Sequence, residues 1–396
     1  MVHSRRWFAS IAGVLSQCAL GCGADAGTVP GTAGTGGSPP VVDPGSLVMS
    51  ASGQAPAVQG YAFPSTSSLD GQFVDGWEMT FSRVLITFAN LSVSLNPDRS
   101  PQDQSQTDGA LANVPGPFAV DLHQGGPNPG HTGGKAIDLA LFAAEDGQVD
   151  FNPELRYGIG FDVVAASPLA AYMNLDGDAQ ADYQEMIAKG YTVLYVGTAR
   201  FKGTQCTSSN PAYDFTRLPS SVNFRFGFRA PASFINCQNP DNDPAQAFPH
   251  EKHQRGIQVK NNMVVRGQAT VHLLTAFADS ALHDAPAHFD PIAAQYLGLP
   301  EGGFTATLED LAGVDFTSFS DREGKPLPWR TCTFSYSPPS SGAVSYDAQS
   351  IAVNPSATPD QALRGFGDYM TYLLASQVFL NGDGVCYVRR NYPSPS

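Results

Sequence analysis

The stretch that decides the fold is residues 221–228, SVNFRFGF. Successive side chains of a β-strand point to opposite faces, so this run places Phe224, Phe226 and Phe228 on one face and Arg225 on the other. Further apolar runs predict strands at 73–95 (two strands with a bend near Asn90), 118–122, 157–164, 191–196, 257–259 and 269–274. Short strands separated by turn-rich loops predict a mainly β chain, an antiparallel β-sandwich that spans residues 46–275.

The pattern changes to helical spacing after residue 275. Short helices are expected at 276–282, 291–297 and 308–312, and a longer helix begins with Thr358 as N-cap and Pro359 in the first position. We therefore expect residues 276–396 to form a helical C-terminal section packed on the sandwich. One more short helix is expected at 136–144, within the sandwich region.

The composition limits the function. The 396 residues carry a formal net charge of −14, which excludes the basic surface that nucleic-acid-binding proteins use. Charged residues make up 15% of the chain, compared with about 25% in a typical domain, and the 40 Gly and 31 Pro favour a loop-rich β protein. The chain has no GxSxG, P-loop or dinucleotide-binding motif, so the sequence favours a non-enzymatic role.

Residues 1–21 have the pattern of a secretory signal peptide. Two arginines precede an apolar core at 7–20, which is too short to span a membrane permanently. The core ends in ALGC at 19–22, which resembles a bacterial lipobox, and we expect cleavage before Cys22 and lipid attachment to its thiol. No Asp follows Cys22 directly, which in such lipoproteins implies release to the outer membrane. The alternative is ordinary cleavage near Ala24, which would give a free periplasmic or secreted protein.

The segment that follows the lipobox is expected to be a tether. Residues 22–45, CGADAGTVPGTAGTGGSPPVVDPG, contain almost nothing to bury in a core. Segments of this composition stay disordered and act as flexible linkers. We therefore expect the folded part to be held off the outer membrane, facing the periplasm or the cell surface.

Four further cysteines indicate disulfides. They are Cys206, Cys237, Cys332 and Cys386. An even number of cysteines in an oxidising compartment predicts disulfides, and sequential pairing, Cys206 with Cys237 and Cys332 with Cys386, is our prediction. Four cysteines allow three connectivities. No pair has the short spacing of a zinc knuckle, so thiolate metal ligation is not expected.

An acidic run at 174–185 has the spacing of a calcium-binding loop. Oxygen-bearing side chains stand at the EF-hand positions 1, 3, 5, 7, 9 and 12, namely Asn174, Asp176, Asp178, Gln180, Asp182 and Glu185. The first position is Asn instead of Asp, and Ala179 stands where a sharp turn favours Gly. The alternative is a solvated acidic turn that leads into a helix, with Asp182 and Glu185 near the helix N-terminus, where its dipole favours negative charge.

A second candidate metal site contains imidazole groups. His272, His283 and His288 lie among aspartates at 279, 284 and 290. Imidazole with carboxylate is a suitable ligand set for Zn²⁺ or Cu²⁺. The alternative is a polar loop between a strand and the first C-terminal helices.

Three short motifs resemble a known family. They are Asp75-Gly76-Trp77, the RYGIGF run at 156–161, and a strand that begins at Gly190-Tyr191 and ends at Gly197. Their order resembles the MbnP-like periplasmic proteins of the metallo-mystery pair, over about residues 73–203. The resemblance implies copper handling and a di-haem cytochrome partner. The chain departs from the family at 183–189, where no Trp occurs although the family has a Trp-rich run.

The C-terminal section carries a second resemblance. The motifs HFDPIAAQ at 288–295, TLEDLAGV at 307–314 and NGDGVC at 381–386 are similar to those of myxobacterial-type lipoproteins of unknown role. This resemblance bears on architecture and localisation only. It agrees with the lipobox in pointing to an anchored, exported protein.

Two functional hypotheses follow, and an enzyme is a third and weaker one. The first is an outer-membrane-anchored lipoprotein that binds or delivers a metal, with Ca²⁺, Cu or Zn as the cofactor and a di-haem cytochrome as partner. The second is a structural or interaction lipoprotein that binds an outer-membrane partner, such as a receptor, without a metal site. Both hypotheses place the protein at the membrane through a lipid anchor.

Overall fold

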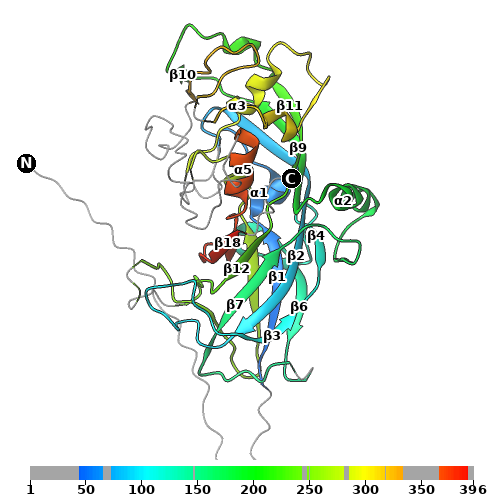
Figure 1. Ribbon diagram of the computed structural model, residues 1–396, viewed down its shortest axis with the longest axis vertical. Helices are drawn as coiled ribbons and strands as arrows, with labels where there is room; N and C mark the ends of the chain where they lie inside the picture. The colour runs from blue at the N-terminus through cyan, green and yellow to red at the C-terminus, as the bar shows by residue number, and fades with distance from the viewer. Residues whose placement is uncertain are drawn as a thin grey trace, which may run out of the picture. The chain divides into compact units, whose positions relative to one another are not determined.

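The central element of the fold is β2 (Trp77–Ser94), an 18-residue strand in the larger of two main sheets (Figure 1). The computed structural model describes residues 44–65, 73–145, 148–242, 248, 250–280, 285–316, 318–332 and 365–390. β2 is one strand, with an irregularity at the predicted bend. Asn90 has a φ of 50°, and the register against β7 (Arg156–Val163) shifts between Ala89 and Ser92.

Among the described residues, the larger sheet has eleven strands and follows the order β15-β11-β9-β2-β7-β12-β18, with β3, β4, β8 and β13 attached. The other bounds are β3 (Ala110–Val114), β4 (Phe118–Asp121), β8 (Ala171–Tyr172), β9 (Val193–Phe201), β11 (Ser221–Phe228), β12 (Ala232–Ile235), β13 (Ile257–Gln258), β15 (Thr305–Ala306) and β18 (Tyr387–Arg390). Most of its pairings are antiparallel, including those of β2 with β7 and β9. The predicted strand at 221–228 is confirmed.

The second sheet has five strands in the order β17-β14-β1-β6-β5. Their bounds are β1 (Ser46–Gly53), β5 (Asn128–Pro129), β6 (Lys135–Phe142), β14 (Val264–Val271) and β17 (Val378–Leu380). The pairing of β1 with β14 is parallel. A separate two-stranded sheet joins β10 (Cys206–Ser208) to β16 (Arg330–Cys332).

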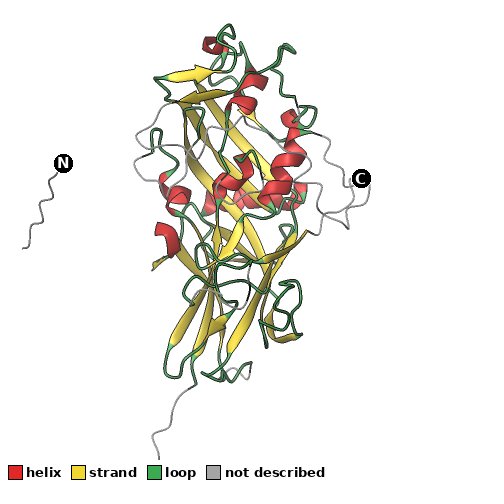
Figure 2. Ribbon diagram, turned by 90° about the vertical axis from the view of Figure 1, so that its left-hand side faces the viewer, coloured by secondary structure: helices red, strands yellow, loops and turns green. Residues whose placement is uncertain are grey.

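Helices are added to this framework, and in Figure 2 they lie in its middle and upper part while strands extend below them. The α-helices are α1 (Ala55–Gln59), α2 (Gly177–Lys189), α3 (Asp290–Ala293) and α5 (Phe366–Leu374). Short 3-10 helices are η1 (His131–Gly133), η2 (Phe215–Arg217), η3 (Leu273–Phe277), η4 (Ala294–Tyr296) and η5 (Glu309–Leu311). The chain is therefore mainly β, a sandwich with helical additions, as predicted.

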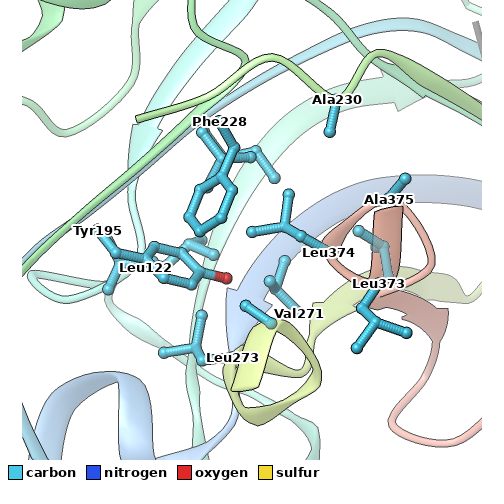
Figure 3. Packing of buried hydrophobic residues seen from close by; sticks show 14 of the residues in the cluster. Leu122, Tyr195, Phe228, Ala230, Val271, Leu273, Leu373, Leu374 and Ala375 are labelled. Carbon is cyan, nitrogen blue, oxygen red and sulfur yellow. The ribbon is translucent and has the colours of Figure 1, made fainter. Parts of the chain in front are cut away.

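The core lies between the sheets and under the C-terminal helix. Tyr195 and Phe228 of the larger sheet face Val271 of the second sheet and Leu374 of α5 (Figure 3). Phe224, Phe226 and Phe228 are all fully buried, as their alternation predicts. Burial of each such aromatic side chain contributes about 1.5–3 kcal/mol, so this row is a main source of stability.

The prediction of a helix at 136–144 is wrong, because these residues form most of β6. β6 pairs with β1, with Val48 opposite Leu141 and Ala51 opposite Ile137. Local composition favours a helix here, but an open edge of β1 offers backbone partners, and tertiary pairing overrides weak propensity.

The described part of the C-terminal section contains helices, as predicted, and also four short strands, of which β15, β17 and β18 join the two main sheets and β16 belongs to the separate two-stranded sheet. β15 pairs with β11, β16 with β10, β17 with β14 and β18 with β12. The predicted helix start at Thr358 lies outside the described residues, and α5 is described from Phe366. The section is therefore part of the sheets as well as a cover for them.

The four cysteines form two disulfides, but the predicted sequential pairing is wrong. Cys206 is bonded to Cys332, and Cys237 is bonded to Cys386. The reason is strand pairing, because Cys206 lies opposite Cys332 in the β10–β16 pair. Likewise, Cys237 follows β12 and Cys386 precedes β18, and these two strands are antiparallel neighbours. Each disulfide therefore joins the C-terminal section to the sandwich.

Candidate functional site

The acidic run at 174–185 lies mostly on helix α2. Asp176 is the N-cap, and its side chain accepts a hydrogen bond from the Ala179 backbone N–H at 2.7 Å. Gly190 ends the helix in the left-handed conformation with φ 67°. This conformation differs from the loop that the EF-hand spacing predicts. It also differs in part from the alternative, because the helix begins at Gly177, so most of the acidic run is helical and Asp182 and Glu185 lie beyond its first turn. The helix buries Ala179, Tyr183 and Met186.

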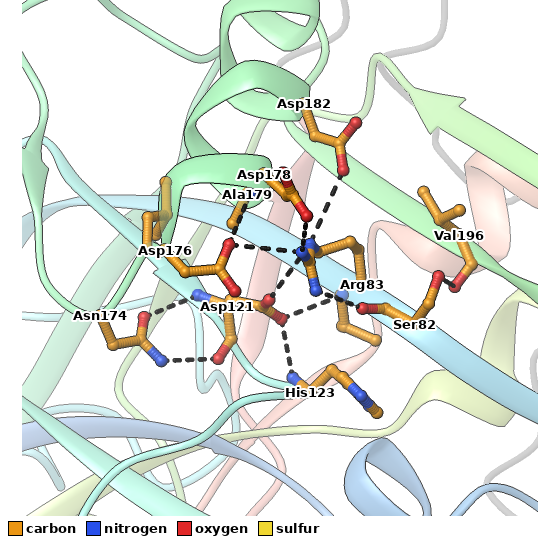
Figure 4. A network of polar contacts seen from close by, with 12 residues as sticks. Ser82, Arg83, Asp121, His123, Asn174, Asp176, Asp178, Ala179, Asp182 and Val196 are labelled. Carbon is orange, nitrogen blue, oxygen red and sulfur yellow. Dashed lines mark hydrogen bonds and ion pairs between the residues drawn. The ribbon is translucent and has the colours of Figure 1, made fainter.

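Four carboxylates surround one arginine of the sheet (Figure 4). Arg83 of β2 lies 3.3 Å from Asp176, 3.7 Å from Asp182, and 3.9 Å from both Asp178 and Asp121. Asp176, Asp178 and Asp182 are candidate calcium ligands, so the structure brings three of the six together. All three lie next to the guanidinium group of Arg83. This group supplies the positive charge that a bound metal ion would otherwise supply.

A second arginine binds the next turn of the helix. Arg225 of β11 donates from Nη2 to Asp182 at 2.7 Å and from Nε to Glu185 at 2.9 Å. The strand alternation placed Arg225 on the face opposite the three phenylalanines, and α2 covers that face. Arg83 and Arg225 thus connect helix α2 to the outer face of the larger sheet.

The two amides of the acidic run have other partners. Asn174 accepts from the Asp121 N–H at 2.8 Å and donates to the carbonyls of Asp121 and Gly125 at 2.8 and 3.0 Å. Gln180 donates to the Leu175 carbonyl at 3.0 Å. Both amides hold the backbone around the start of α2, so the six candidate ligands do not share one centre.

Asp121 is the member of this network that sequence reasoning missed. It is the last residue of β4 and is fully buried, and its Oδ1 accepts from the N–H groups of Val84 and His123 at 3.2 and 2.9 Å. Its Oδ2 accepts no hydrogen bond from the described residues and faces Arg83. Burial raises the pKa of Asp121. A buried carboxylate at the end of a strand carries no sequence motif that would have identified it.

The candidate imidazole site is only partly described. His272 follows β14, and its Nε2 lies 2.8 Å from the Gly382 carbonyl oxygen. Its ring lies against that of Phe379, with centroids 4.3 Å apart and planes tilted by 38°. His288 is buried, 3.5 Å from Asp279 and beside Trp329. His283 lies outside the described residues. Among the residues that the structure describes, no group of three or more His, Cys, Asp or Glu is arranged to hold a metal.

A buried ionic cluster joins the DGW motif to the C-terminal section. Asp290 accepts from Trp77 Nε1 at 2.8 Å and from Arg330 Nε at 2.9 Å. The Arg330 guanidinium also lies over the rings of Phe201 and Phe215, at 4.0 and 4.6 Å from their centroids. Sequence reasoning missed this cluster, because its members are far apart in the chain.

Asp75 completes the buried cluster. Its Oδ2 accepts from the N–H groups of Phe289 and Asp290, both at 2.7 Å, and thus caps the start of α3. Burial, followed by the charge of Asp290, raises the pKa of Asp75 to about 7. Gly76 next to it has a φ of 92°, and a Cβ there would lie 2.7 Å from Cys332 Sγ. The DGW motif is therefore the point at which β2, α3 and one disulfide meet.

Comparisons with known proteins add no family to these observations. No family model, curated protein or solved structure matches the chain. Within the described part of the chain, no helix is long and apolar enough to cross a membrane. The lipid-attachment candidate, Cys22, lies outside the described residues. The MbnP-like resemblance therefore stays a prediction from the three motifs.

Proposed function

We propose that the protein is an outer-membrane lipoprotein, anchored through Cys22, whose sandwich is a structural or interaction module for an outer-membrane partner. The observation that supports export most strongly is the pair of disulfides, which close separations of 126 and 149 residues. Disulfides form and persist in oxidising compartments such as the periplasm and the cell surface. The lipobox-like ALGC sequence then supplies the anchor.

The contacts of α2 favour an interaction module over a metal carrier. The acidic side chains of this helix pair with Arg83 and Arg225, so a cation would have to compete with two guanidinium groups. An ion pair between a helix and a sheet also fixes the helix in place. The outer face of α2 is then a preformed surface for a partner, such as an outer-membrane receptor.

The anchor is tested by substitution of Cys22. Cys22→Ala should abolish incorporation of a labelled fatty acid and leave an uncleaved precursor or a soluble protein. Cys18→Ala is the matched control, because Cys18 lies in the same signal segment but outside the lipobox. Retention of Cys22→Ala in the membrane with its lipid label would refute the anchor.

A second candidate function is weak Ca²⁺ binding at the Arg83 network. The observation in its favour is Asp121, whose buried Oδ2 accepts no hydrogen bond from the described residues and faces Asp176 and Asp182 across Arg83. Ca²⁺ at ten times its Kd would stabilise the fold by about 1.4 kcal/mol. Millimolar Ca²⁺ should then raise the melting temperature, and Asp178→Ala with Asp182→Asn, two carboxylates beside Arg83, should remove the effect.

The MbnP-like resemblance adds Cu as cofactor and a di-haem cytochrome as partner to this metal-binding alternative, and the imidazole candidates His272, His283 and His288 add Zn or Cu. Metal analysis of the purified protein tests both metals directly. Co-purification from membranes separates the partners, because a haem absorption spectrum in the eluate would favour the cytochrome. A metal-free protein that captures an outer-membrane receptor would favour the interaction module.

A further inference from the structure

Exposed apolar side chains gather at one end of the sandwich. Leu141, Leu155, Met263 and Val264 expose 45%, 44%, 52% and 64% of their surface. We call these four residues the apolar tip. Large apolar side chains in contact with one another at the surface of a protein mark binding sites more often than scattered ones do.

Strand pairing places three of the four residues, Met263, Val264 and Leu141, beside the start of β1. Val264 pairs with Ser46, the first residue of β1, and the Ser46 N–H donates to the Met263 carbonyl at 3.0 Å. Leu141 pairs with Val48 on the other side of β1. Paired residues and residues two apart in a strand share a face, so Val264 and Leu141 flank β1 on the outer face of the second sheet.

The larger sheet ends at the same place. β13 pairs with the start of β7, which puts Leu155 beside the short loop 259–263. This loop ends at Met263 and leads into β14. Leu95 and Leu111, 36% and 46% exposed, lie near the Ser94 pairings with β7 and β3. Figure 1 shows β1, β3, β6 and β7 in the same, lower part of the sandwich.

The start of the folded chain lies at this end as well. β1 begins at Ser46, so the segment that follows Cys22 must reach the sandwich at the apolar tip. Twenty-three residues, 23–45, separate Cys22 from β1. A flexible chain of that length has a root-mean-square end-to-end distance of about 25 Å. A lipid on Cys22 therefore keeps the apolar tip, more than any other part of the sandwich, near the bilayer surface.

The segment that carries Met263 and Val264 is basic, although the exposed Glu154 stands next to Leu155 at the same end. Residues 259–266, VKNNMVVR, contain two basic residues and no acidic residue in a chain with net charge −14. Lys260 is exposed and Arg266 pairs with Asp138. Apolar side chains next to lysine are typical of segments that lie at a membrane interface, with the lysine near the phosphates.

We propose that the apolar tip rests on the bilayer, with Met263 and Val264 in contact with the lipid interface, and so sets the orientation of the anchored sandwich. This inference rests on the proposed lipid anchor. A two-point attachment, one through Cys22 and one through the apolar tip, would present the opposite end and helix α2 away from the membrane.

The test places a fluorescent reporter in the full lipidated chain. Val264→Trp and, as matched control, Leu169→Trp are each reconstituted into phosphatidylethanolamine/phosphatidylglycerol vesicles that contain brominated lipid. Leu169 is 84% exposed and lies before α2, outside the apolar tip. Trp77 is buried and Trp329 is partly buried. Both are present in each variant, so the two variants share the same background emission.

Bromines near the top of the acyl chains reach an indole that is about 5–10 Å deep, so we expect roughly twofold more quenching of Val264→Trp than of Leu169→Trp. Aqueous iodide should show the reverse order. If both variants sediment with vesicles but are quenched equally by brominated lipid, the inference is refuted and the anchor stands. If the indole of Val264→Trp is shielded from both quenchers, a protein covers the apolar tip, which also refutes the inference. If neither variant sediments, the proposed anchor fails.

Discussion

Replacing Asp75 by Asn should remove a pH dependence from the stability of this protein. The pKa of Asp75 rises from 3.8 to about 7 on folding, because the carboxyl group is buried and close to Asp290. Between these two pH values the folded state binds the proton and the unfolded state does not. The free energy of unfolding therefore falls as the pH rises through this window.

The magnitude follows from the separation of the two pKa values, which corresponds to about 4 kcal/mol. The Asn carbonyl can accept the two hydrogen bonds that Phe289 and Asp290 donate to Asp75 Oδ2. Asp75→Asn cannot ionise, so its stability relative to the natural protein should increase by about 4 kcal/mol from pH 4 to pH 8. Asp75→Leu is the control, because it also lacks the charge but leaves two buried N–H groups unsatisfied, at a cost of about 1–3 kcal/mol each at every pH.

Urea unfolding followed by tryptophan fluorescence measures this difference, with the disulfides intact, at five pH values from 4 to 8. The two variants should give parallel pH profiles, and the natural protein should lose stability relative to both as the pH rises. A difference between Asp75→Asn and the natural protein that stays constant across the range would refute the buried-carboxyl argument.

Three further predictions concern the ionic networks and the disulfides. Arg330→Met should lower the free energy of unfolding by about 3–5 kcal/mol, because it leaves the buried Asp290 without its cation; thermal melting checks this. Arg83→Ala should lower the free energy of unfolding by roughly 1–3 kcal/mol, because the buried Asp121 loses the cation beside it. The same substitution should make the melting temperature rise with millimolar Ca²⁺, since the four carboxylates no longer share a guanidinium group. An unchanged response to Ca²⁺ would count against any cation site there. Non-reducing peptide mapping should recover the two interleaved disulfides, and recovery of the sequential pairs would contradict the fold.

Local patterns in the sequence predicted the strands and the sandwich well. The alternation at 221–228 identified β11, the face that enters the core, and the opposite face on which Arg225 meets α2. Such signals succeed because they depend only on the two-residue period of a strand. The prediction of a helix at 136–144 was wrong because the conformation of this segment is determined by its pairing with β1 and not by its own composition.

The candidate site was less predictable because its contacts join distant segments. The spacing at 174–185 identified acidic side chains that do gather, but their centre is Arg83, 91 positions before Asn174 in the chain. The buried pair of Asp290 and Arg330 and the crossed disulfides depend on which strands become neighbours. No local spacing contains that information.

The measurement that tests the central claim most directly is the intact mass of the protein extracted from the outer membrane. The account predicts a chain that begins at Cys22 and carries the added mass of its lipid, with both disulfides formed. A soluble chain that begins near Ala24 without lipid would contradict it.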